Sequence, residues 1–221
     1  MPWLFSCFKK LREPVCGLTH LAGFFLSVAG LVYFAYHGAF KSHHLAAFSV
    51  FSASLIFLYG TSALYHLLPA SERGLVILRR LDHIMIFVLI AGTYTPICLI
   101  PLRGWWGWSL LAAVWAVAGA GIIGKLCWFN APRRLYTGIY LAMGWMVVIA
   151  VYPLANALPT AGLLWLLSGG LFYTVGAIIY ACKYPDMAPG VFGFHELWHI
   201  FVMAGSFCHW WVMMQYLTPM N

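Results

Sequence analysis

Seven long runs of apolar residues, separated by short polar breaks, make up this sequence. Each run is about 20 residues long, the length that a helix needs to cross a bilayer. Strands of a membrane barrel would instead alternate apolar and polar residues. The pattern therefore predicts an all-α membrane protein, a seven-transmembrane helix bundle in a single domain over residues 1–221. The predicted spans are 17–38, 45–68, 81–101, 105–128, 135–157, 160–182 and 195–217.

Two prolines, Pro96 and Pro153, fall inside predicted spans. Proline removes a backbone hydrogen bond from a helix, and membrane helices tolerate it where neighbouring groups satisfy the freed carbonyls. We therefore expect a kinked helix at each proline rather than the end of a span.

The composition agrees with a chain whose solvent is mostly lipid. Hydrophobic residues make up 63% of it and charged residues only 8%, whereas a soluble domain carries about 25% charged residues. The formal net charge is +7, which in a soluble protein would suggest a nucleic-acid partner. Because the basic residues lie in the short breaks between spans, they favour a role in membrane topology and no nucleic-acid binding.

The distribution of basic residues predicts an orientation. Ten of the 12 lysines and arginines lie in the N-terminal segment, in the breaks after the second, fourth and sixth spans or, for Lys125, at the end of the fourth span. Only Lys41 and Arg103 lie on the other side. Basic residues are enriched in cytoplasmic loops. We expect a cytoplasmic N-terminus and, with an odd number of spans, an extracytoplasmic C-terminus.

The six cysteines give no sign of a disulfide framework or of a thiolate metal site. None of them forms a CxxC pair, and most lie inside apolar runs. Cysteines in such places behave as small buried hydrophobic residues.

Ionisable residues inside membrane spans are costly and are candidates for function. His195 and His199 are four residues apart, so both rings lie on one face of the seventh span. Ser62 and His66 have the same spacing at the end of the second span, and Asp82 begins the third. The expected topology brings the ends of these three spans into one layer.

Three neutral imidazoles and a water molecule suit tetrahedral zinc. We expect His66, His195 and His199 to bind it, Asp82 to orient or deprotonate the water, and Ser62 to hydrogen-bond the water or a ligand. Two alternatives stay open: the histidines cap helices at the membrane interface, or Asp82 interacts with the helix dipole or a nearby arginine.

Other histidines are weaker candidates. His20 lies in the same expected layer, whereas His83 points about 100° away from Asp82 on its helix. His209 lies roughly 15 Å beyond His199 along the seventh span, too far to share an ion.

The segment from His195 to His199 also matches the HExxH pattern of zinc metalloproteases, in which Glu196 would be the general base. The pattern is short, and no acidic residue follows Glu196 to complete a ligand set. A protease is therefore the weaker interpretation.

Four motifs carry a resemblance to a known family: SALYH (Ser62–His66), LDHIMIFVLIAGTYTP (Leu81–Pro96), YLAMGW (Tyr140–Trp145) and FHELWHIFVMAGSFCH (Phe194–His209). Nearly the whole chain resembles the hemolysin-III branch of the progestin and adiponectin receptor (PAQR) family, which is distantly similar to alkaline ceramidases. The resemblance implies a seven-helix fold with a cytoplasmic N-terminus and zinc ligands at His66, His195 and His199. It implies that Asp82 acts on the zinc-bound water and that Ser62 belongs to the same site.

These features lead to three functional hypotheses. The first is a zinc-dependent hydrolase of a membrane lipid amide or ester, as the similarity to ceramidases implies. The second is a regulator or sensor of membrane homeostasis in which zinc is structural. The third is a lytic, hemolysin-like protein, for which the spans offer no polar pore-lining stripe. The short terminal segments are typical of bacterial members, so the expected location is the bacterial inner (plasma) membrane.

Overall fold

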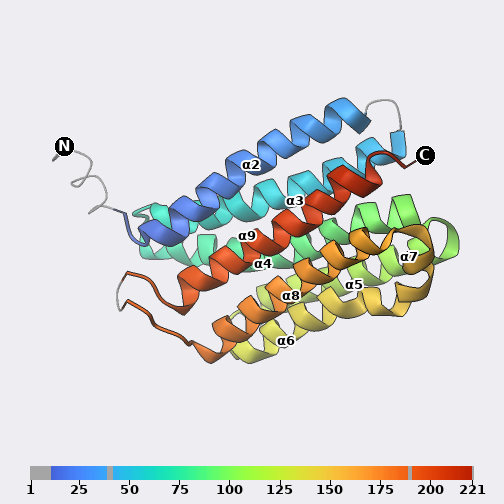
Figure 1. The fold of residues 1–221 in the computed structure, drawn as a ribbon. Helices are drawn as coiled ribbons and strands as arrows, with labels where there is room; N and C mark the ends of the chain where they lie inside the picture. Colours follow the sequence, from blue (N-terminus) through green and yellow to red (C-terminus); the bar gives the residue numbers. More distant parts are fainter. Residues whose placement is uncertain (1–10, 39–41, 189–190, 221) are drawn as a thin grey trace.

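A computed structural model describes residues 11–38, 42–188 and 191–220, and in these ranges the chain is helical apart from its connections. Seven helical segments are long and apolar enough to cross a membrane, which confirms the prediction of a seven-helix membrane protein. Figure 1 shows the bundle. Its helices are α2 (Pro14–Gly38), α3 (Ser42–Leu67), α4 (Glu72–Ile97), α5 (Gly104–Cys127), α6 (Arg133–Gly144), α7 (Val151–Ala157), α8 (Thr160–Cys182) and α9 (Phe194–Val212).

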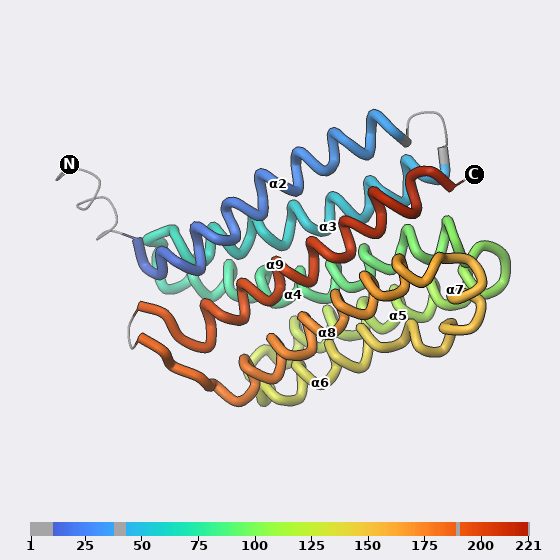
Figure 2. The backbone as a smooth tube through the Cα atoms, in the orientation of Figure 1, coloured from blue at the N-terminus to red at the C-terminus, as the bar shows by residue number. Residues whose placement is uncertain are grey.

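The seventh span, α9, lies between α2 and α8 in Figures 1 and 2 and packs mainly on α8 and less extensively on α2. The most deeply buried span is α4. It packs closely on α3 because Gly92 has no side chain, and a Cβ at this position would collide with Ser54. This packing fixes the middle of α3 against the second half of α4.

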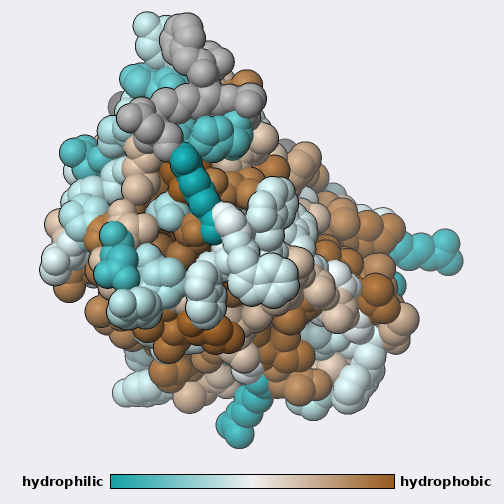
Figure 3. All heavy atoms as spheres, turned by 90° about the vertical axis from the view of Figure 1, so that its right-hand side faces the viewer, coloured by the Kyte–Doolittle hydropathy of each residue, from teal (hydrophilic) through white to brown (hydrophobic). Residues whose placement is uncertain are grey.

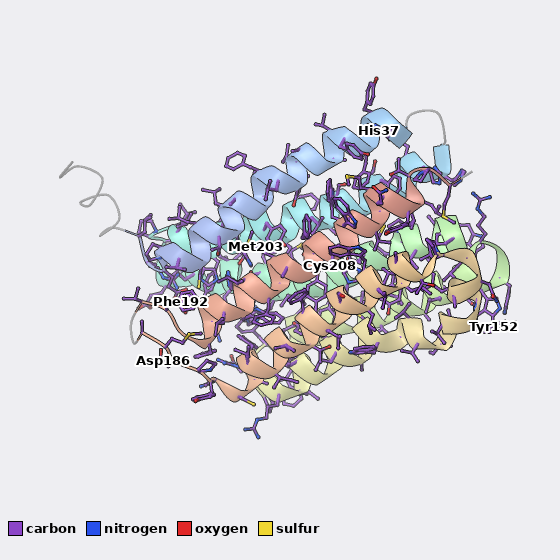
Figure 4. All side chains as sticks on the ribbon, viewed as in Figure 1. His37, Tyr152, Asp186, Phe192, Met203 and Cys208 are labelled. Carbon is purple, nitrogen blue, oxygen red and sulfur yellow. The ribbon has the colours of Figure 1, made fainter. Side chains whose placement is uncertain are left out.

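One end of the bundle carries the connecting residues 68–71, 128–132, 183–188 and 191–193, and we call it the basic end. Asp186 and Phe192, in the connection before α9, lie at this end, whereas His37 and Tyr152 lie at the opposite end (Figure 4). The start of α2 lies at the basic end, and the end of α9 lies at the opposite end. The two ends of the described chain are therefore separated by the length of the bundle.

The third span begins nine residues before the predicted start at residue 81, because α4 starts at Glu72. Ser71 caps this helix: its hydroxyl accepts a hydrogen bond from the Gly74 amide at 3.3 Å. Arg73, Arg79 and Arg80 therefore lie on a helix rather than in a loop. The apolar run marks only the part of a helix that can lie in the bilayer, whereas the capping residue determines where the helix begins.

Both prolines lie inside helical spans, and each is next to an irregular turn. A π-helical turn, Cys98–Leu102, follows Pro96, and a 3₁₀ turn, Trp145–Ala150, precedes Pro153. Tyr94 joins the two regions. Its hydroxyl lies 2.6 Å from the Gly144 carbonyl, to which it donates, and accepts from the Val147 amide at 2.8 Å. The Tyr94 side chain thus satisfies backbone groups of the irregular turn that precedes Pro153.

Large apolar side chains cover the outer faces of the helices. Phe25, Leu26, Phe57 and Ile123 are each more than half exposed, which is the arrangement required of a surface that contacts lipid. Figure 3 looks onto the end opposite the basic end, where hydrophobic residues cover much of the surface and strongly hydrophilic ones are few. The chain is a multi-pass membrane protein.

Candidate metal centre

Three buried or half-buried histidines meet at the basic end of the bundle. His66 lies in the last turn of α3, while His195 and His199 lie on one face at the start of α9. Their ring centroids are 5.1 Å apart for His66 and His195, 4.8 Å for His66 and His199, and 4.9 Å for His195 and His199. The fold thus brings together the three histidines that sequence analysis selected as ligands.

The segment before α2 is fastened to the end of α3. The last carbonyls of a helix have no partner within the helix, and here Arg12 donates to the Tyr65 carbonyl at 3.1 Å. The Glu13 amide donates to the His66 carbonyl at 3.1 Å. Proline at the first position of α2, Pro14, suits the start of a helix because its amide would be unpaired there. These bonds place Glu13 beside the His66 ring.

Residues 13–16 contact the Nδ1 atoms of all three histidines. His66 Nδ1 is hydrogen-bonded to the Glu13 carboxylate, and His199 Nδ1 donates to the Cys16 carbonyl at 3.3 Å. His195 Nδ1 lies 4.0 Å from the Cys16 sulfur. The His66 hydrogen bond also holds the pKa of the Glu13 carboxyl below its usual range. A carboxylate or carbonyl on one ring nitrogen sets the tautomer and turns the other nitrogen towards a ligand.

The donor atoms of Glu13, Cys16, His66 and His195 all lie within 4.8 Å of one another, so this group could hold a metal ion. His199 and Asp82 are outside this tightest group. Sequence analysis missed Glu13 and treated Cys16 only as a buried apolar residue. The available signal was that Glu13 is one of only five acidic residues and directly precedes the first span.

The chemistry of the donor set fits a metal ion. Among the described residues, His66 Nε2 is buried without a hydrogen-bond partner, and a buried imidazole nitrogen normally has one. An ion bound there would give this nitrogen a partner. Imidazole ligands suit zinc, copper, iron and nickel, so the residues that surround the site do not by themselves identify the metal.

The carboxylate of Glu196 is already engaged. One oxygen accepts a hydrogen bond from the Gly193 amide at 2.8 Å, at the start of α9, and the other accepts from the Cys16 thiol at 3.1 Å. These bonds cap α9 and connect it to α2. They leave Glu196 poorly placed to act as the general base of a metalloprotease.

Asp82 and Ser62 face the same cavity as His195 and His199. Ser62 lies one helical turn before His66 and is buried close to Asp82. Its hydroxyl makes no hydrogen bond of normal geometry among the described residues. Asp82 also borders a smaller hollow of about 210 Å³ together with Glu13 and His195. Both predicted polar residues therefore lie beside the histidine cluster.

The cavity has a volume of about 980 Å³ and mostly apolar walls, including Ile86, Ile90 and Leu166. It follows α9 from His195 to His209, a distance of roughly 20 Å at 1.5 Å per residue. This chamber could not be read from the sequence, because the residues that line it come from helices far apart in the chain.

The other histidines have distinct environments. His20 is buried and stacks on His199, so it belongs to the histidine cluster. His83 stacks on Phe129, and His209 stacks on Tyr173 at the far end of the cavity. His83 and His209 therefore lie outside the cluster.

Comparison with known proteins gives a clear relationship. The profile of the family described as "Haemolysin-III related" matches residues 8–210. The chain belongs to the haemolysin-III related family. The chain is 38% identical over 212 residues to Hemolysin-3 of Bacillus cereus, covering 94% of this chain and 93% of that protein. It is also 38% identical over 201 residues to the Hemolysin-3 homolog of Bacillus subtilis (strain 168), covering 90% and 91%.

More distant similarity joins this haemolysin-III related chain to the adiponectin receptors. It is 26% identical over 234 residues to the Adiponectin receptor protein of Drosophila melanogaster, covering 95% of this chain but 52% of that protein. These relatives support the assignment to the hemolysin-III branch of the PAQR family. The family match includes α3 and α9, which carry the three histidines.

Proposed function

We propose that this chain is a zinc-dependent hydrolase that cleaves an amide or ester bond in a membrane lipid. The observation that carries the proposal is the shared cavity, in which Asp82 and Ser62 face the same space as His199. Beyond these polar groups the walls are apolar for roughly 20 Å along α9. Such a chamber suits an amphiphilic substrate whose tail lies among apolar side chains while its polar end meets the histidines.

In this proposal His66, His195 and His199 hold the metal through their Nε2 atoms. Zinc would supply a Lewis acid that activates a water molecule and polarises the substrate carbonyl. The unpartnered Nε2 of His66 and the contact of its Nδ1 with Glu13 support this role.

Asp82 would take the proton of the attacking water and later deliver it to the leaving group. The hydroxyl of Ser62 would hydrogen-bond the substrate carbonyl or the water. Glu196 is a weaker candidate for the base, because its two carboxylate oxygens already accept bonds from Gly193 and Cys16.

We place the protein in a bacterial plasma membrane with its N-terminus in the cytoplasm. The bacterial relatives support the membrane, and the concentration of lysine and arginine at the basic end supports the orientation. The site would then open near the cytoplasmic surface.

A regulator of membrane homeostasis with a structural metal is the second candidate. It is favoured by the bonds that fasten residues 12–16 to α3 and α9 at the same cluster. A metal there would join three helices without any turnover.

Purified protein in lipid nanodiscs, incubated with a ceramide and with phospholipids, tests the proposal. Mass spectrometry should detect a released fatty acid with the zinc-loaded protein. It should detect no released fatty acid with the chelated protein or with the His199→Ala variant. The exposed His37, changed to Ala, is the matched control. Bound zinc without product from any lipid would favour the regulator, whereas dye leakage from vesicles without product would favour a lytic protein.

A further inference from the structure

A buried lysine lies in the wall of the cavity. Lys125, in the last turn of α5, is only 4% exposed. Its ammonium lies 3.7 Å from the centre of the Tyr136 ring and 5.2 Å from that of Phe129. Among the described residues it makes no ion pair. Lysine is almost never fully buried without a charged partner, and contact with aromatic rings compensates only part of the lost hydration.

Arginines accompany this lysine at the same end of the cavity. Arg79 lies over Phe129 with its guanidinium carbon 5.5 Å from the ring centre. Arg133 donates to the Tyr180 carbonyl at 3.0 Å and lies over the Tyr180 ring. Among the described residues that line the cavity, Asp82 is the only acidic one against five basic ones. Arg79 is exposed and interacts electrostatically with Asp82, so Lys125 is the buried cation of this wall that has no acidic partner among the described residues.

We propose that Lys125, Arg79 and Arg133 bind the phosphate of an anionic phospholipid whose acyl chain occupies the cavity. A phosphate offers several acceptor oxygens, which an ammonium and two guanidinium groups can share, whereas a carboxylate offers two. The continuous apolar wall beside these residues, with Ile86 and Ile90, selects a lipid over free phosphate.

Enrichment of basic residues in cytoplasmic loops does not explain this arrangement. That effect requires only charge near the membrane surface, which exposed residues such as Arg73 supply. Burying an ammonium adds a desolvation cost without helping topology. A cation at a cavity wall instead provides a binding site for an anion.

This inference names a substrate class and in that respect rests on the proposed hydrolase. The basic cluster lies next to the proposed base, because the Phe129 ring that contacts Lys125 also stacks on His83, which follows Asp82. Hydrolysis of the lipid ester would break the bond between the acyl carbon and the glycerol oxygen. The hydroxyl of water would go to the acyl carbon and its proton to the glycerol oxygen.

Binding can be measured independently of turnover. The zinc-free protein in detergent, analysed by native mass spectrometry, would be offered phosphatidylglycerol, diacylglycerol with the same chains, oleate and inorganic phosphate. We expect phosphatidylglycerol to bind most tightly. Lys125→Met should weaken its binding roughly tenfold or more, the usual effect of losing a hydrogen bond to a charged group. Lys125→Arg should retain most of the affinity.

Arg73→Gln is the matched control, because it removes a positive charge from the same end of the protein without touching the cavity. Melting temperatures of all variants separate lost binding from lost folding, and Arg79→Gln provides a second test if Lys125→Met does not fold. Equal binding of diacylglycerol and phosphatidylglycerol would overturn the inference, as would tighter binding of oleate or of inorganic phosphate. Preferential binding of phosphatidylglycerol without turnover would contradict only the proposed hydrolase. Turnover without preferential binding of phosphatidylglycerol would contradict only the proposed phosphate site.

Discussion

The imidazole ring of His20 stacks on that of His199, with ring centroids 3.7 Å apart and the planes inclined by 19°. His20 comes from α2 and His199 from α9, so the stack connects the first and the last span. The His20 ring also contacts the Tyr59 ring edge-on, with ring centroids 5.0 Å apart. His20 thus fixes the position of a proposed metal ligand from the neighbouring span.

We expect His20→Ala to weaken zinc binding by roughly 10- to 100-fold, the effect typical of residues that orient a ligand. His20→Phe keeps a flat ring for stacking and should restore most of the affinity. Competition with a fluorescent chelator measures both variants. Identical affinities in His20→Ala and the unmodified protein would show that the stack does not position His199.

The metal centre itself makes a simple prediction. Purified protein should contain about one zinc per chain, held by three histidines. Each single replacement of His66, His195 or His199 by alanine should remove most of the zinc, as measured by elemental analysis. His209→Ala should keep the metal, because this histidine lies at the far end of the cavity. Full zinc content in His199→Ala would exclude it as a ligand and favour the group of Glu13, Cys16, His66 and His195.

Glu13 can act as a ligand or as the residue that orients His66, and two substitutions separate these roles. If it orients His66, Glu13→Gln should lower zinc affinity by roughly 10- to 100-fold while keeping the stoichiometry. Glu72→Gln, an exposed acid in the first turn of α4, is the control. Complete loss of metal in Glu13→Gln, with normal content in Cys16→Ser, would instead identify the Glu13 carboxylate as a ligand.

Asp82 and Glu196 are the two candidates for a general base. Asp82→Asn should keep zinc and melting temperature but lower lipid hydrolysis by roughly 10²- to 10⁴-fold, because the amide cannot accept the proton. Glu196→Gln should lower it far less. Product release, zinc content and melting temperature on the same preparations decide between them. The reverse pattern, with Glu196→Gln inactive and Asp82→Asn normal, would support the metalloprotease-like interpretation.

The orientation predicts reporter activities. An enzyme that works only outside the cytoplasm should be active when fused after Asn221 and silent when inserted in the α8–α9 connection, because the end of α9 and this connection lie at opposite ends of the bundle. Activity at the connection and silence at the C-terminus would reverse the orientation and place the histidines near the outer surface.

The class of fold could be predicted from the sequence because helices that lie in lipid appear as long apolar runs in a hydropathy profile. It predicted His195 and His199 as neighbours because a helix repeats every 3.6 residues. It failed for the start of α4, since the Ser71 cap continues the helix through polar residues that hydropathy excludes.

Long-range packing explains what sequence analysis missed at the site. Glu13 and Cys16 reach the histidines only because α2 packs between α3 and α9, and no local pattern records that contact. Lys125 was counted among the loop residues that set orientation, yet it faces inward. Helical periodicity in an almost wholly apolar span does not distinguish the face towards a cavity from the face towards lipid.

The contact between His199 and Cys16 joins residues 183 positions apart in the chain. During synthesis, the first six spans can enter the membrane while the histidine cluster still lacks two of its four rings, because His195 and His199 arrive with the last helix. Assembly of the cluster is therefore a late event that reports a completely inserted chain. A protein truncated before α9 would expose Glu13, Cys16 and His66 without the partners that bury them, which makes it a natural substrate for membrane quality control.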